Sequence, residues 1–171
     1  GVLLSEQFLR PIEDLTLGMT AIKERQFDVQ VKIHAHDELG DVSGLMNQVL
    51  DGMKDLQIAH VVQESLFPQK PLDIGTYRIF GKSRSMTDIG GDYFDYFLTS
   101  DQRLLGIIGD VSGHGVSAAL VMGMAKCALV MGQSPGKSLP DLLSGFSSFL
   151  FNTLSRKKMM TMFLFSLDHE N

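Results

Sequence analysis

Residues 89–120 read IGGDYFDYFLTSDQRLLGIIGDVSGHGVSAAL and hold two apolar, β-prone runs. Each run carries an aspartate beside glycine: Asp92 follows two glycines and Asp110 follows one. Glycine lets the backbone turn sharply and approach other groups closely. Because only a hairpin-length segment separates the runs, they predict two neighbouring strands that bring both aspartates to one point.

Two carboxylates at one point suit hard divalent cations. Mg²⁺ and Mn²⁺ take oxygen ligands from carboxylates, backbone carbonyls and water, and paired ions can activate a water between them as a nucleophile. The alternative interpretation is that Asp92 and Asp110 are ordinary turn residues, because aspartate beside glycine is common in loops. Spacing alone leaves both interpretations open.

The runs GGDYFD and GDVSGHGVSAALVM, in this order and each near a strand signal, resemble the bacterial SpoIIE-type branch of the metal-dependent protein phosphatases, the PPM or protein phosphatase 2C-like family. The resemblance covers residues 66–168. It implies a phosphoserine or phosphothreonine phosphatase with an αββα sandwich fold and two divalent cations, Mn²⁺ or Mg²⁺. It also implies that Asp92 binds one metal, that Asp110 bridges both, and that the Val111 carbonyl completes the second site. Asp92 and Asp110 would then be the catalytic residues.

The turn of Gly113, His114 and Gly115 precedes a predicted helix, whose N-terminus favours the substrate phosphate. His114 either hydrogen-bonds the leaving oxygen or packs locally, and the sequence leaves both roles open. Asp95 belongs to the same family run, but on a strand it points to the face opposite Asp92, so we predict a structural role for it. Asp141 lies in the run Ser-Leu-Pro-Asp, a capping box, and is predicted to cap a helix.

The phosphatase family carries further metal-binding aspartates in a later half, after a turn similar to Asn-Ala-Gly-His. The acids after Asp110 are Asp141, Asp168 and Glu170, and none lies in such a run. We therefore expect the chain to be the N-terminal part of a phosphatase domain. Alone it should bind metal weakly and hydrolyse its substrate slowly, because two carboxylates cannot neutralise the charge of two divalent ions.

Composition and charge indicate the kind of protein and exclude one class of binding partner, nucleic acid. A hydrophobic content of 44% suffices for a core, and the single cysteine, Cys127, excludes an internal disulfide and indicates a reducing compartment. The net charge of −5 belongs to the first part, because residues 1–70 hold 6 Lys+Arg against 11 Asp+Glu and residues 71–171 hold 9 against 9. No basic surface suited to nucleic acid is predicted.

Apolar residues recur at coiled-coil spacing in two segments before residue 57. The first seam comprises Phe8, Ile12, Leu15, Met19 and Ile22, and the second comprises Val42, Met46, Val49, Met53 and Leu56. Their steps alternate between four and three residues, as in a coiled coil. Residues 27–33 alternate apolar and polar and suit an extended connector. Two short helices joined in this way should pair in parallel, and they need a second copy to bury their stripes, so we predict a homodimer.

The run RPIE at 10–13, DELG at 37–40 and MN at 46–47 resemble a HAMP domain, the relay module that follows the last membrane helix of bacterial receptors. The resemblance covers residues 5–57 and implies a four-helix bundle in the dimer. It implies a domain over residues 1–57 in which residues 1–7 end a membrane helix, and a location on the cytoplasmic side of the bacterial cell membrane. Asp37 and Glu38 are predicted to cap the second helix.

Residues 58–70 are predicted to be a linker helix that precedes a phosphatase domain over residues 71–171. The spacing of the apolar residues changes here, because Leu56, Ala59, Val62 and Leu66 no longer alternate steps of four and three. Such a change alters the coiled-coil winding locally, so the helix can transmit a rotation to the residues that follow it. His60 offers a competing interpretation, because the phosphoacceptor histidine of a sensor kinase lies on such a helix. Val61 rather than an acid follows it, however, and the nucleotide-binding boxes of a kinase are absent.

Beyond Pro71 the pattern predicts strands over residues 76–82, 93–98, 104–108 and 162–167, with one helix after Gly115 and another from Ser138 to Leu154. The predicted class is α+β. The predicted function is a signal-transducing metal-dependent serine/threonine phosphatase of a bacterial membrane receptor, and the resemblance implies an anti-sigma-factor antagonist as its phosphoprotein substrate. A non-catalytic signalling and dimerisation module and a histidine-kinase-like relay are the alternatives.

Overall fold

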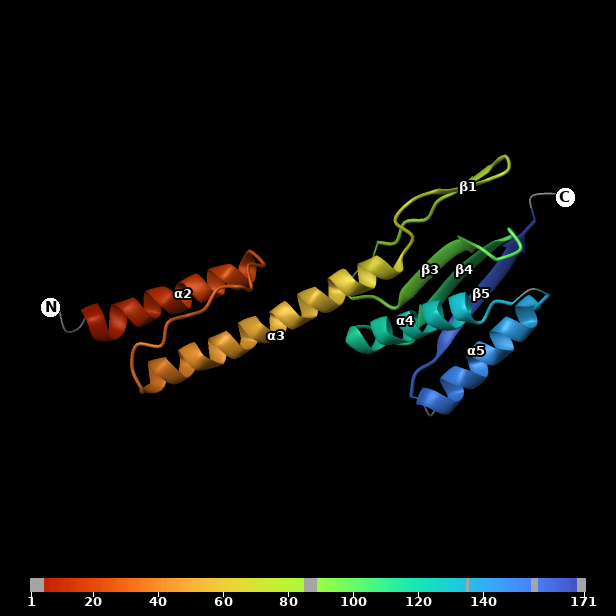
Figure 1. The fold of residues 1–171 in the computed structure, drawn as a ribbon. Helices are drawn as coiled ribbons and strands as arrows, with labels where there is room; N and C mark the ends of the chain where they lie inside the picture. The colour runs from red at the N-terminus through yellow and green to blue at the C-terminus, as the bar shows by residue number, and fades with distance from the viewer. Residues whose placement is uncertain (1–4, 85–88, 135, 155–156, 169–171) are drawn as a thin grey trace. The chain divides into compact units, whose positions relative to one another are not determined.

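The computed structural model describes residues 5–84, 89–134, 136–154 and 157–168. They divide into two units, residues 1–58 and residues 59–171. The first unit is helical and the second mixes helices with sheets, which confirms the predicted α+β class (Figure 1). No helix among the described residues is both long and apolar enough to cross a membrane. Residues 1–4 of the expected membrane-helix end lie outside the described residues.

In the first unit, the π-helix η1 (Ser5–Leu9) leads into α2 (Arg10–Lys23), and a connector then returns the chain to the start of α3 (Glu38–Leu66). Helix α2 and the first part of α3 run in parallel, as the seams predict (Figure 1). Pro11 lies in the first turn of α2, where its missing N–H costs nothing. Asp37 caps α3, because its Oδ1 accepts from the N–H groups of Leu39 and Gly40 at 3.1 and 3.0 Å.

The connector is held to the helices by one side chain and a small core. The half-buried Asn47 accepts from the Val31 N–H at 2.8 Å and donates to the Val31 carbonyl at 2.9 Å, so both polar groups of its amide are paired. A side chain at Gly18 would strike Val31, so glycine lets the connector approach α2. The core consists of Ala21, Val31 and Leu50, with Leu15, Ile22, Phe27 and Met46 packed against it.

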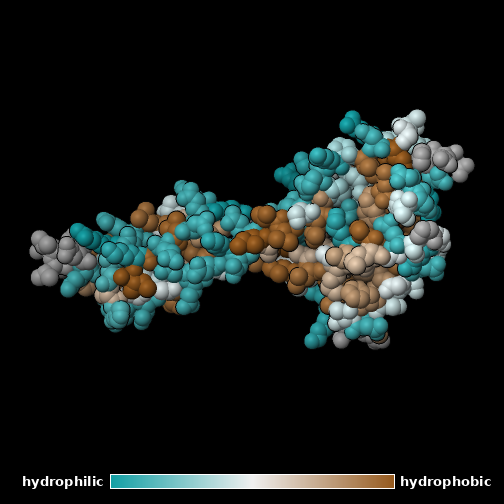
Figure 2. All heavy atoms as spheres, in the orientation of Figure 1, coloured by the Kyte–Doolittle hydropathy of each residue, from teal (hydrophilic) through white to brown (hydrophobic). Residues whose placement is uncertain are grey.

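Both seams leave apolar side chains on the surface of the first unit. More than a third of each of these side chains is exposed: Phe8, Ile12, Met19, Val42, Val49 and Leu56. Figure 2 shows brown patches on the largely teal surface of this unit. A single chain therefore leaves its stripes uncovered, and the homodimer stays a prediction that this exposure supports.

The second unit begins with a hairpin of β1 (Leu72–Ile74) and β2 (Tyr77–Ile79). The predicted strand over residues 76–82 is therefore wrong in extent, and β1 escaped prediction. Gly75, at a φ of 55°, reverses the chain, so residues 72–74 fold back on β2. Residues 80 and 81 continue instead as an irregular segment in which Gly81 lies against the ring of Phe94.

The main sheet has three antiparallel strands in the order β3 (Asp92–Leu98), β4 (Leu104–Val111) and β5 (Met160–Leu167). These confirm the three later predicted strands, and β4 runs three residues further, to Val111. Helices α4 (Val116–Met131) and α5 (Leu139–Leu154) cover one face of the sheet (Figure 1). The core between them includes Tyr93, Ile107, Val111, Ala118, Val121, Met122, Ala125, Leu129, Phe146 and Leu150.

Helix α5 begins with the predicted capping box. The Ser138 hydroxyl accepts from the Asp141 N–H at 3.3 Å and donates to the Asp141 carboxylate at 2.6 Å. The Ser138 hydroxyl thus caps the helix and the Asp141 carboxylate holds that hydroxyl, in agreement with the predicted capping box.

The opposite face of the main sheet carries Ile108 and Phe163, which the strand register places side by side. Their side chains are 61% and 64% exposed. The three-stranded main sheet with its helical layer corresponds to one half of the expected αββα sandwich.

Candidate metal centre

Asp92 and Asp110 lie directly opposite each other in the β3–β4 register. Paired residues on antiparallel strands have Cα atoms about 5 Å apart and side chains on the same face. Both aspartates are exposed. Like charges in this arrangement repel each other, so a bound cation would remove an unfavourable interaction.

Two loops are tied together at the end of this strand pair. The Val111 N–H donates to the Gly91 carbonyl at 3.0 Å, and the Gly115 N–H donates to the Ile89 carbonyl at 3.0 Å. The run of glycines before Asp92 therefore lies along the turn that follows Asp110.

Gly91 faces three oxygen atoms. A Cβ at this position would lie 2.8 Å from the Gly113 carbonyl oxygen, 3.1 Å from Oδ1 of Asp110 and still closer to the Val111 carbonyl oxygen. Only a residue without a side chain leaves these oxygens undisturbed. The oxygens belong to residues that the sequence predicts at the metal and phosphate sites.

Carboxylate and carbonyl oxygens of this kind fit Mg²⁺ or Mn²⁺. Asp92, Asp110 and the Val111 carbonyl are the residues that could hold such ions. Among the described residues, no three His, Cys, Asp or Glu side chains lie close enough together to hold a metal. The chain therefore brings two carboxylates and neighbouring carbonyls to the site, which fit part of a two-metal centre.

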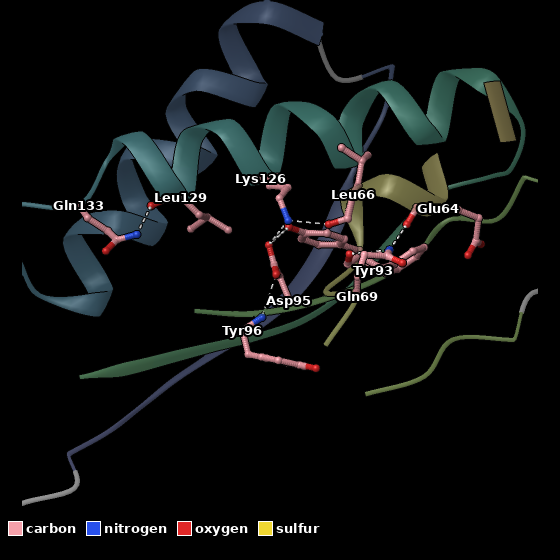
Figure 3. A network of polar contacts seen from close by, with 10 residues as sticks. Glu64, Leu66, Gln69, Tyr93, Asp95, Tyr96, Lys126, Leu129 and Gln133 are labelled. Carbon is pink, nitrogen blue, oxygen red and sulfur yellow. Dashed lines mark hydrogen bonds and ion pairs between the residues drawn. The ribbon is translucent and has the colours of Figure 1, made fainter. Parts of the chain in front are cut away.

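Asp95 lies on the other face of β3 and serves the core. Its side chain is only 4% exposed and accepts from the Tyr93 hydroxyl at 2.8 Å, the Tyr96 N–H at 2.9 Å and Nζ of Lys126 at 3.0 Å (Figure 3). Burial, and secondarily the Asp95 charge, raise the pKa of the Tyr93 hydroxyl well above its usual value. The predicted structural role of Asp95 agrees with these contacts.

Lys126 connects this network to the end of α3. Besides Asp95, its ammonium donates to the Leu66 carbonyl at 2.6 Å (Figure 3). That carbonyl belongs to the last turn of α3, whose final carbonyls lack partners within the helix. Lys126 is the one charged residue between Val116 and Met131, and this lone charge in an apolar helix is the signal that the sequence gives for its role.

Gln63 joins the end of α3 to the glycine loop. Its side chain is 3% exposed, donates to the Gly90 carbonyl at 2.7 Å and contacts the sulfur of Met122 at 2.9 Å. The last turns of α3 thus hold the residue two positions before Asp92. Sequence reasoning missed this role, because one glutamine among the polar residues of a linker helix gives no distinctive pattern.

The turn after Asp110 carries the predicted phosphate-site residues. Gly113 and Gly115 adopt φ values of 83° and 80°, which favour glycine, and His114 between them is exposed. Helix α4 begins at Val116 without a side-chain cap. Nζ of Lys158 donates to the Ser112 carbonyl at 2.9 Å. Lys158 ends the basic run of Arg156, Lys157 and Lys158, whose pattern alone indicates a solvated turn, and Arg156 lies outside the described residues.

His60, the residue on which a kinase-like relay would depend, is partly buried on α3. Its Nδ1 is shielded from solvent and has no hydrogen-bond partner among the described residues. A shielded ring nitrogen gives no support to a phosphoacceptor role.

Comparison with known protein families now identifies both parts of the chain. Residues 3–55 match the HAMP domain, and residues 100–171 match Stage II sporulation protein E (SpoIIE). The chain joins a HAMP domain to a SpoIIE-family domain. Both predicted resemblances are confirmed. The SpoIIE match includes Asp110, Val111 and the glycine turn, whereas Asp92 lies eight residues before its start.

A relative with similarity across much of the chain is Protein IcfG of Synechocystis sp. (strain ATCC 27184 / PCC 6803 / Kazusa). The two are 28% identical over 136 residues, which cover 70% of this chain. The chain spans 22% of the length of this relative.

The packing around Gly91 gives a first prediction. Gly91→Ala should lower the free energy of unfolding by about 1–3 kcal/mol, because the added methyl group displaces the turn after Asp110. The matched control is Gly145→Ala in α5, where nothing lies within 4 Å of the added carbon. This control should be neutral or stabilising by up to about 1 kcal/mol. Chemical denaturation of the two variants measures both effects, and equal stability of the variants would contradict the close approach at Gly91.

Proposed function

We propose that the chain is the relay module and the N-terminal part of the catalytic domain of a metal-dependent serine/threonine protein phosphatase of a bacterial membrane receptor. The observation that carries the proposal is the placement of Asp92 opposite Asp110 beside the oxygens that face Gly91. The SpoIIE-family match supports a phosphatase-type hydrolase, and the HAMP match supports signal transduction. In this proposal the HAMP module lies on the cytoplasmic side of the membrane.

Each site residue has a proposed task. Asp92 and Asp110 hold the divalent cations, Mn²⁺ or Mg²⁺, and the Val111 carbonyl contributes a neutral oxygen. Two such ions supply Lewis acidity that activates a water nucleophile and neutralises phosphate charge. Water adds to phosphorus, the bond from phosphorus to the serine or threonine oxygen breaks, and that oxygen takes up a proton. His114 is exposed in the turn, and its proposed task is to hydrogen-bond this leaving oxygen.

The proposed substrate is a phosphoprotein of the anti-sigma-factor antagonist type. Among the described residues, both carboxylates are exposed on the sheet face away from α4 and α5, at one end of the β3–β4 pair. The support for a phosphoprotein substrate is the SpoIIE-family match over residues 100–171.

The HAMP module is proposed to control this site through α3. Gln63 holds the Gly90 carbonyl, and the Leu66 carbonyl is held by Lys126. A rotation or shift of the last turns of α3 would therefore move the glycine loop before Asp92. Because both contacts come from the last turn of α3, the position of this helix end determines the position of the glycine loop.

A non-catalytic signalling module remains the second candidate. The observation that favours it is the presence of only two carboxylates at the site among the described residues. Hydrolysis that persists without Asp92 would remove the phosphatase proposal in its favour.

The site assignment predicts different outcomes for two aspartates. In the full-length protein, Asp110→Ala should abolish Mn²⁺-dependent phosphatase activity, because the bridging carboxylate is lost. Asp141→Ala should leave activity largely intact, because Asp141 only caps α5. Rates of phosphate release measure the difference. Comparable rates for the two variants would overturn the assignment.

The relay predicts effects of changes far from the metal centre. Replacing Val49 by glutamate should weaken dimerisation, because burying a charge in an apolar seam is costly. Inserting one alanine after Leu56 rotates the following residues by about 100°, so it should change activity while keeping every metal ligand.

Analytical ultracentrifugation measures the first effect and phosphatase assays measure the second. The matched control for the seam is Gln48→Glu, which adds a charge at an exposed polar position beside Val49. The relay is wrong if the Val49 variant dimerises like wild type, or if the insertion leaves both activity and its response to signal unchanged.

A further inference from the structure

Lys158 lies at the turn between Asp110 and helix α4. Its Nζ donates to the Ser112 carbonyl at 2.9 Å, and it would lie 3.0 Å from a Cβ placed on Gly113. The ammonium therefore sits against the turn whose carbonyl oxygens, from Val111 and Gly113, face Gly91.

The position of Lys158 is fixed by its neighbour. The Ser112 N–H donates to the Met159 carbonyl at 2.8 Å, and the Met159 N–H donates to the Ser112 hydroxyl at 3.0 Å. These two bonds attach the start of β5 to the turn after Asp110. The two hydrogen bonds fix the backbone beside Lys158, and neither involves the Lys158 ammonium.

The charge of Lys158 has no acidic partner in the described part of the chain. The ion pairs found there involve other cations, and the one hydrogen bond of the Lys158 ammonium goes to a neutral carbonyl. An ammonium has three donors, so two remain for another acceptor. Beside a centre for divalent cations, a lysine also repels the metals unless an anion lies between them. Both features suit an anionic ligand.

We propose that Lys158 binds the phosphate group of the substrate, a proposal that rests on the proposed phosphatase function. A lysine is a compact charge with rotatable donors and binds phosphate oxygens through charge-assisted hydrogen bonds. Its position at the turn of Gly113, His114 and Gly115 places the charge beside the predicted phosphate site. Lys158 thus adds a side chain from the start of β5 to a site otherwise built from β3, β4 and the turn.

The test uses the full-length protein with p-nitrophenyl phosphate as substrate and inorganic phosphate as competitive inhibitor. Lys158→Met should raise both KM and the inhibition constant of phosphate about tenfold or more, as expected for loss of a charge-assisted bond. Lys158→Gln should show the same loss although it keeps a donor for Ser112, and Lys158→Arg should retain most of the affinity. Lys157→Met removes the neighbouring exposed charge and should change neither constant.

Thermal unfolding and the Mn²⁺ concentration for half-maximal activity separate binding from a structural role. Both should stay near wild-type values in the Lys158→Gln and Lys158→Met variants. The role of Lys158 is overturned if KM and the phosphate inhibition constant stay unchanged, if Lys157→Met weakens them equally, or if Lys158→Gln restores them. Wild-type protein without Mn²⁺-dependent hydrolysis would instead overturn the proposed function, and the role of Lys158 with it.

Discussion

The pairing of β3 with β4 is the constraint on which the candidate site depends. Because side chains alternate between the faces of a strand, a shift of one residue in register would separate Asp92 from Asp110 and turn one of them toward the helices. The register is fixed from the other face, where Tyr93, Ile107 and Val111 are buried against α4. The apolar core therefore determines the position of two exposed carboxylates that contribute nothing to it.

Polar contacts extend this constraint to the end of α3. Asp95 and Tyr93 are buried and form a network with the half-buried Lys126, which continues to the Leu66 carbonyl (Figure 3). Gln63, on the same last turns of α3, donates to the Gly90 carbonyl. Buried polar groups that lose a partner are costly, so this network favours one position of the last helical turns. The residues before Asp92 are thus held by the linker helix on one side and by the turn after Asp110 on the other.

Much of this architecture could be predicted from local patterns. Heptad spacing predicted the two helices, Asp37 and Ser138 predicted helix starts, and two aspartates beside glycines predicted a shared site. Strand β1 escaped prediction and β2 was predicted too long, because three-residue strands carry too little periodicity to be recognised. The roles of Gln63, Lys126 and Lys158 escaped it for a different reason. Each of these side chains acts on a backbone carbonyl 27, 60 or 46 residues away in the sequence, and only the fold brings such distant positions together.

The central claim is that Asp92 and Asp110 share a divalent metal centre. Anomalous diffraction from crystals of the full-length protein grown with Mn²⁺ tests it most directly, because the signal locates the metal without reference to activity. We expect anomalous density in contact with both carboxylates and the Val111 carbonyl, and its loss in the Asp92→Asn, Asp110→Asn double variant. An active protein that binds Mn²⁺ elsewhere, with no density between these aspartates, would contradict it.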